Sequence, residues 1–221
     1  MTSGRLSRVD TPAWRLVGSV LAWTAFTFFF LGLYQAAAAV MSLGGSCASG
    51  GPYVIGVECP ESVIVFAPIG IFGMMFAVGV ALFVARGFGV ALVAWAWPIL
   101  FVGLGLQFLL EITGGQGIVV NLLCGIMFLV FGLVPVWFVI SSKTVVPTLV
   151  GSRRLTGERF SYDGKARRYF GLKPTEGGDE VRPVPADWAL SLGVWVVSVG
   201  LGGWLSLVAF AAVAAAGVGD A

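Results

Sequence analysis

Long apolar runs alternate with short polar stretches along this chain, and each run has the length of a membrane span. A helix of about 20 residues crosses the hydrocarbon core of a bilayer, and five runs reach that length. Glycine, proline and polar residues separate the runs, as expected where helices end. The pattern predicts an all-α integral membrane protein, a bundle of five transmembrane helices at residues 16–41, 62–85, 88–110, 118–140 and 187–216.

Composition supports the membrane class and removes several kinds of chemistry. The chain is 58% hydrophobic and 11% charged, with a mean hydropathy of +0.96, whereas soluble domains are about 25% charged. It contains no histidine, which excludes a Ser–His protease and bis-histidine haem ligation. The apolar run that begins at Leu16 is too long for the core of a cleavable signal peptide, which spans about 7–15 residues.

The distribution of charge predicts how the chain is oriented. All 13 Lys and Arg residues fall at residues 1–15, at the turn 86–87 or at 141–186, which lie on one side of a five-helix bundle. The charged residues of the opposite side are all acidic, namely Glu58, Glu61, Glu111 and Asp220. By the positive-inside rule the basic side is cytoplasmic, so we expect the N-terminus inside and the C-terminus outside.

This orientation assigns each polar stretch to a side of the membrane. The chain then has a cytoplasmic N-terminus at 1–15, an extracellular loop at 42–61, an extracellular turn at 111–117 and a basic cytoplasmic segment at 141–186. Thr11 and Pro12 are suited to begin the first helix, and Asp187 is suited to cap the last one. Trp14 and Trp23 are expected to be anchors at the membrane interface.

Cys47 and Cys59 lie in the extracellular loop, where thiols oxidise and remain oxidised. The intervening glycines and Pro52 let the loop close, so we expect a disulfide worth about 3 kcal/mol in the chain-entropy model. Its simplest role is a structural link between the first two helices. The alternative is a redox-active pair, which the wide spacing disfavours because dithiol oxidoreductases use Cys-x-x-Cys.

The loop sequence from Gly44 to Tyr53, closing at Glu58-Cys59-Pro60, resembles an outer loop of small, uncharacterised multi-pass membrane proteins of high-GC Gram-positive bacteria. The resemblance covers only this small part of the chain. It implies a location in the bacterial plasma membrane and a disulfide between the matching cysteines. It implies no activity.

The predicted spans carry almost no ionisable side chains in their interiors. Transported protons and ions usually need such groups, which are costly in lipid, so we expect neither proton-coupled pumping nor intramembrane acid–base catalysis. The sequence contains no metal-ligand cluster, phosphate-binding glycine loop or kinase-type signature. We therefore predict that the protein is not an enzyme and uses no cofactor and no metal.

One group of polar residues is expected near the outer ends of the spans. Gln107 and Glu111 are four residues apart and share a helix face, Asn121 begins the fourth span, and Gln35 lies near the end of the first. We expect these side chains to cap helices and to hydrogen-bond between them, at about 0.6–2 kcal/mol per contact. Alternatively, they line an outward-facing polar vestibule.

Small residues recur at four-residue spacing in two spans, which lets helix backbones approach closely. These stripes are Gly73, Ala77, Ala81 and Ala85 in the second span and Ser198, Gly202 and Ser206 in the last. We expect them to pack inside the bundle, with a face for another subunit as the alternative.

Basic and aromatic residues interleave in the cytoplasmic segment. Between Lys143 and Lys173 the basic residues far outnumber the two acids, Glu158 and Asp163. Such a stretch is drawn to anionic lipid headgroups, at about 1 kcal/mol per basic residue. We expect a solvated, lipid-associated arm, with docking of a protein partner as the alternative and no nucleic-acid motif. The candidate contact residues are Arg153, Arg154, Arg159, Lys165, Arg167 and Arg168.

Abundant contact surface without evident chemistry favours a non-enzymatic accessory subunit or scaffold that binds a membrane or cytoplasmic partner. The alternative function is a small channel or transporter that uses the polar vestibule. Five helices and the lack of visible internal repeats differ from the usual construction of transporters. An enzyme acting on lipid at the outer face ranks below both, because only four carboxylates are available there.

Overall fold

The computed structural model describes residues 12–43, 47–48, 56–114, 117–162 and 180–216 of the 221-residue chain. Within these ranges, five helices are long and apolar enough to cross a membrane, as predicted. They are α1 (Pro12–Ser42), α2 (Glu61–Val84), α3 (Ala91–Leu110), α4 (Ile118–Ser141) and α7 (Pro185–Ala216). The shorter elements are η2 (Glu111–Gly114), α5 (Val145–Val150), β1 (Arg159–Phe160) and β2 (Glu180–Val181), and the two strands pair in parallel.

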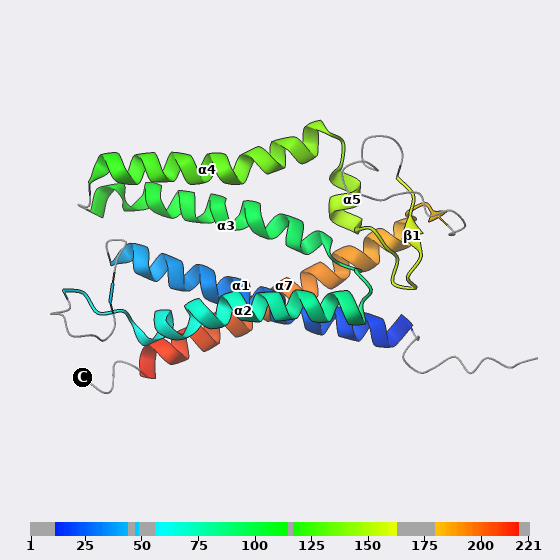
Figure 1. Cartoon of the computed structure of the whole chain (residues 1–221), viewed down its shortest axis with the longest axis horizontal. Coiled ribbons are helices and arrows are strands. Elements are labelled where there is room, and N and C mark those ends of the chain that lie inside the picture. The colour runs from blue at the N-terminus through cyan, green and yellow to red at the C-terminus, as the bar shows by residue number, and fades with distance from the viewer. Residues whose placement is uncertain (1–11, 44–46, 49–55, 115–116, 163–179, 217–221) are drawn as a thin grey trace, which may run out of the picture.

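The helices form two groups that run side by side (Figure 1). Helices α1, α2 and α7 pack on one another and make the three-helix unit, while α3 and α4 pair as the α3–α4 hairpin. Helix α5 and the strands β1 and β2 gather at one end, beside the beginnings of α1 and α7, whereas η2 lies at the other end, between α3 and α4. We call the end that holds α5 the basic end, because the described Lys and Arg residues lie there. The end of α1, the start of α2 and the end of α7 lie at the opposite end.

The start of α3 and the start of α7 differ from the predicted boundaries for local reasons. The turn between α2 and α3 is longer than Arg86-Gly87, because positive φ angles at Arg86 (51°), Gly87 (84°) and Gly89 (78°) end one helix and delay the next. Helix α7 begins at Pro185, where proline suits the first helical position. Asp187 therefore lies inside the first turn, and its carboxylate accepts the Val184 N–H at 2.9 Å, as in half of a capping box.

The core of the three-helix unit forms where α1 meets the small-residue stripe of α2. Ala77, Ala81 and Ala85 are buried there and share one cluster with Trp23 and Phe88. Trp23 is fully buried, and its indole N–H donates to the Phe88 carbonyl at 3.1 Å. The prediction that Trp23 anchors the membrane interface is therefore wrong, because the α2–α3 turn folds over it.

The stripe on α7 packs against the other side of α1. Ser198 and Ser206 are fully buried, and a Cβ at Gly202 would collide with the Thr24 carbonyl oxygen. Both stripes therefore pack inside the bundle, which confirms the first of the two interpretations made from sequence.

The α3–α4 hairpin is held by close backbone approach at glycines. A Cβ at Gly132 would lie 2.8 Å from the backbone nitrogen of Val102, and one at Gly105 would lie 2.9 Å from that of Leu129. Pro135 in α4 has no N–H to bond the Phe131 carbonyl. The Trp97 indole of α3 donates to this carbonyl at 3.3 Å, so a neighbouring helix satisfies the group that the proline frees.

Candidate functional site

Residues 144–162, which we call the docked segment, fold against the basic end of the bundle (Figure 1). Val150, Leu155 and Phe160 are almost completely buried, and Leu155 joins the core cluster that contains Trp23. Helix α5 contacts both α3 and α7. This part of the chain is therefore packed rather than solvated, unlike the arm expected from its composition.

The docked segment begins at a tight helix end. The Lys143 N–H donates to Ile140 and the Thr144 N–H donates to Val139, which is the bonding pattern of a Schellman motif at the end of α4. Lys143 occupies the left-handed position of this motif, with φ 57°, where glycine is usual. A cation at this end of a helix is favoured by the helix dipole, which offsets part of the backbone cost.

Arg15 fastens the docked segment to α1. The residue is only 5% exposed, and its guanidinium donates to the carbonyls of Leu155 at 3.3 Å and Thr156 at 2.6 Å. Gly157 follows at φ 102°, in the left-handed region that favours glycine. Its hypothetical Cβ would lie 3.6 Å from the Arg15 guanidinium, so the tight turn at Gly157 lies directly against this arginine.

Arg154 fastens the docked segment to α7. Its guanidinium donates two hydrogen bonds to the Asp187 carboxylate, both at 2.9 Å, and a third to Glu158 at 2.8 Å. Hydrogen bonding to Asp187 raises the pKa of Arg154 above its ordinary value. Such a bidentate pair fixes both position and orientation. Arg154 was expected to contact lipid or a partner, and the structure instead engages it within the chain.

Two further contacts complete the docking. The Ser191 hydroxyl of α7 donates to the Leu149 carbonyl at 2.9 Å, and the Tyr162 hydroxyl donates to the Gly151 carbonyl. Burial raises the pKa of the Tyr162 phenol, and the nearby Asp187 carboxylate raises it further. The raised pKa favours the neutral phenol, which is the form that donates this hydrogen bond.

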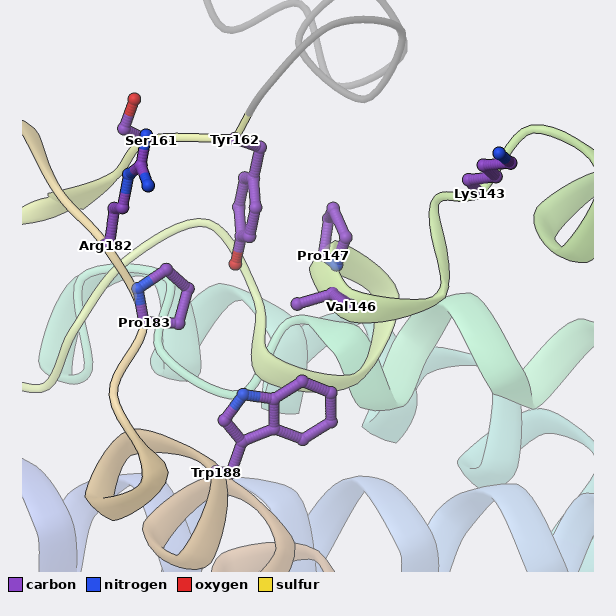
Figure 2. Close-up of a pocket in the computed structure, with 8 residues that line it drawn as sticks. All are labelled: Lys143, Val146, Pro147, Ser161, Tyr162, Arg182, Pro183 and Trp188. Carbon is purple, nitrogen blue, oxygen red and sulfur yellow. The ribbon is translucent and has the colours of Figure 1, made fainter.

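A pocket of about 400 Å³ opens where the docked segment meets the chain entering α7. Figure 2 shows Trp188 on the α7 side, Tyr162 and Pro147 facing it, and Arg182 and Lys143 on opposite sides of Tyr162. Among the described residues that line the pocket, two are cationic and none is acidic. The described residues that line it are Lys143, Val146, Pro147, Ser161, Tyr162, Arg182, Pro183 and Trp188.

Of the other predicted basic contact residues, Arg153 and Arg159 lie side by side. They form an isolated antiparallel bridge, and Arg159 continues into β1, where it pairs with Glu180. Neither residue lines the pocket. Lys165, Arg167 and Arg168 lie outside the described residues.

At the opposite end, the structure brings together three of the four predicted polar residues. Gln107 donates to the Glu111 carboxylate at 3.1 Å, and Asn121 donates to the Glu111 backbone carbonyl at 3.1 Å. Gln35 instead donates to Ser206 on α7 at 3.0 Å and to Leu31 in its own helix at 3.1 Å. These contacts cap α3 and join helices, as in the first interpretation of this group.

Cys47 and Cys59 are paired at disulfide distance, with their Cα atoms 4.9 Å apart. Backbone hydrogen bonds from Ala48 to Val57 and from Cys59 to Ala48 support the pair. The disulfide therefore links the end of α1 to the start of α2, as expected. Cys124 in α4 is the free thiol and is partly exposed.

Sequence reasoning missed the pocket residues Lys143, Arg182 and Trp188. Lys143 and Trp188 lie 45 positions apart in the chain, and no periodic pattern relates a turn to the start of a later helix. The available signal was weaker: a lysine at a helix end where glycine is expected, and a tryptophan in the first turn of a span.

Comparison of the chain with protein-family models, curated proteins and solved structures finds no match. The resemblance of the disulfide loop to an outer loop of small membrane proteins of high-GC Gram-positive bacteria therefore stays a prediction.

Proposed function

We propose that the protein is a non-enzymatic scaffold or accessory subunit of the bacterial plasma membrane, which holds another membrane protein against its α3–α4 hairpin. The observation that carries the proposal is the exposure of α4. This helix packs on α3 along Asn121, Gly125 and Gly132, and its other faces present large apolar side chains that no part of the described chain covers.

An aromatic cluster on the hairpin gives this surface the character of a contact site. Trp97 stacks on Phe101 with ring centroids 4.3 Å apart, and Phe101 contacts Phe128 at 5.4 Å and Phe131 at 6.1 Å. Trp97 and Phe131 are 54% and 51% exposed. Exposed rings held by rigid neighbours are typical of residues that dominate binding energy at interfaces.

The proposal places the basic end in the cytoplasm and the disulfide loop and C-terminus outside. Arg15, Arg86, Lys143 and the docked segment all lie at one end of the helices, which supports this orientation through the positive-inside rule. Labelling with a membrane-impermeant thiol reagent tests it: Cys47 and Cys59 should react only after reduction, and only from outside. If the reagent labelled these cysteines only in inverted vesicles, the orientation would be the opposite of the one proposed.

The alternative of a channel or transporter draws less support from the polar residues at the outer end. Gln107, Glu111 and Asn121 bond to one another, and Gln35 bonds to α7. Groups that already hydrogen-bond within the chain offer less to a passing solute than free groups would.

Site-specific photo-crosslinking in native cells tests the scaffold function. A photoreactive phenylalanine analogue at Phe131 on α4 should give a discrete cross-linked product, which mass spectrometry can identify. The matched control is the same analogue at Phe76 on α2, which is 74% exposed but lies outside the hairpin. Equal products at both positions, or none at Phe131 in membranes that retain known complexes, would contradict the proposal.

A further inference from the structure

The pocket beside α7 lies at the level of the membrane surface. Lys143 comes two residues after α4 ends at Ser141, and Trp188 lies in the first turn of α7. Both helices are long and apolar enough to span a bilayer. A pocket that joins the ends of two spans on the same side lies where lipid headgroups lie.

The lining combines separated positive charge with an apolar floor. Arg182 and Lys143 lie on opposite sides of the opening, and Trp188, Val146 and Pro183 supply apolar surface between α5 and α7 (Figure 2). The Asp187 carboxylate lies close to Tyr162 but accepts two hydrogen bonds from Arg154, which offsets its charge.

We propose that this pocket binds the phosphate-bearing headgroup of an anionic phospholipid. One of the two cations binds the phosphate, and the other adds positive charge on the far side of Tyr162, since guanidinium and ammonium groups are the usual phosphate ligands of proteins. The Trp188 ring and Val146 contact the glycerol and the upper acyl chains, as amphipathic interface residues do. The inference goes beyond the scaffold function and needs only that the helices are inserted in a membrane.

The site differs from a diffuse basic surface because both cations line one pocket and the fold fixes the backbone of Lys143. Lys143 is fixed in a left-handed conformation that is costly for a non-glycine residue. Arg86 adopts a similar φ of 51° outside the pocket, so the conformation alone does not identify the site. What distinguishes Lys143 is that the same fold places its side chain in a pocket wall opposite a second cation.

Isothermal titration calorimetry on the full chain in neutral detergent tests the proposal. The titrants are dihexanoyl phosphatidylglycerol, dihexanoyl phosphatidylcholine and inorganic phosphate. We expect saturable binding of the phosphatidylglycerol, with the other two at least about tenfold weaker. The double variant Lys143→Gln, Arg182→Gln should weaken phosphatidylglycerol binding by about tenfold or more, given the usual contribution of a basic residue near a membrane.

The matched control is Arg153→Gln with Arg159→Gln, which removes the same charge outside the pocket and should change affinity by less than about twofold. Val146→Trp keeps every charge but fills the pocket, so it should also abolish binding. This variant decides the outcome if the charge variant unfolds. If both double variants weakened phosphatidylglycerol binding equally, the lipid would be attracted to the basic surface as a whole and not to the pocket. If phosphatidylcholine bound with equal affinity, the pocket would not recognise the negative charge of the headgroup. If inorganic phosphate bound as tightly as phosphatidylglycerol or more tightly, the pocket would be a site for free anions. If phosphatidylglycerol showed no saturable binding, the proposed lipid site would be refuted.

Discussion

The three-helix unit and the α3–α4 hairpin are similarly apolar but are held together differently. The three-helix unit encloses an aromatic core around Trp23 and is fastened by a disulfide at one end and by the docked segment at the other. The hairpin encloses little, and two of its large rings, Trp97 and Phe131, are exposed. In a bilayer, apolar composition does not drive helices together, so the close contacts decide which surfaces are internal.

The largest difference is expected where α7 meets α1. Gly202→Leu places a side chain against the backbone of Thr24 and Phe28, so we expect the free energy of unfolding of the three-helix unit to fall by about 3 kcal/mol. Denaturation with SDS in mixed micelles measures it. The control is Gly200→Leu on the same helix, where a Cβ meets nothing within 4 Å. Equal losses in the two variants would mean that the close contact is not what holds α7.

A smaller and separable effect is expected in the hairpin. Gly132→Leu forces α4 away from Val102 at a cost of about 2 kcal/mol, while the three-helix unit keeps its unfolding midpoint. Cys124 is the free thiol of α4, so its rate of reaction with a membrane-permeant maleimide should rise several-fold. Gly79→Leu on α2, where a Cβ meets nothing within 4 Å, should leave that rate unchanged. A parallel loss in the three-helix unit would contradict the division into two groups.

The docked segment joins the two groups, and its ion pair should contribute less than the glycine contacts. Asp187→Asn keeps an acceptor for the Val184 N–H but removes the charge that Arg154 faces, which should cost about 1–2 kcal/mol because the pair is partly exposed. The loss should be measurable as faster proteolysis of the docked segment in the Asp187→Asn variant. Glu158→Gln alters a more exposed partner, 42% accessible, and should cost less than about 0.5 kcal/mol.

The smallest effect concerns the hydrogen bond that satisfies α4 at its proline. Trp97→Phe removes the donor to the Phe131 carbonyl and should cost about 0.6 kcal/mol, the average for such bonds between membrane helices. In a Pro135→Ala background the helix supplies its own donor, so the same substitution should cost nothing. An unchanged cost in that background would show that Trp97 acts through packing alone.

The helices and their internal stripes could be predicted because both depend on local spacing. Ala77, Ala81 and Ser198 face inward at intervals that the helical repeat dictates, and the sequence shows that repeat directly. The group of polar residues around Glu111 could be predicted for the same reason, since Gln107 lies one helical turn away and Asn121 follows after a short turn.

The basic end could not be predicted, because its contacts join distant positions. Arg154 meets Asp187 from 33 residues away, and Trp23 meets Phe88 from 65 residues away. Composition correctly marked the segment as basic, but charge alone did not show which cations would be paired inside the chain. The two residues that line the pocket with positive charge, Lys143 and Arg182, flank the region in which sequence reasoning sought the contacts.

The contact of Arg15 has a consequence for biosynthesis. Its carbonyl partner at Leu155 follows 140 residues later, so at about 5–20 residues per second the ribosome needs about 7–28 s to deliver it. Through that interval α1, α2, α3 and α4 emerge in turn while the guanidinium keeps its hydration at the membrane surface. The first four long helices therefore emerge before Arg15 can make this contact, and the pairing of Arg154 with Asp187 must wait longer, until α7 has begun to emerge.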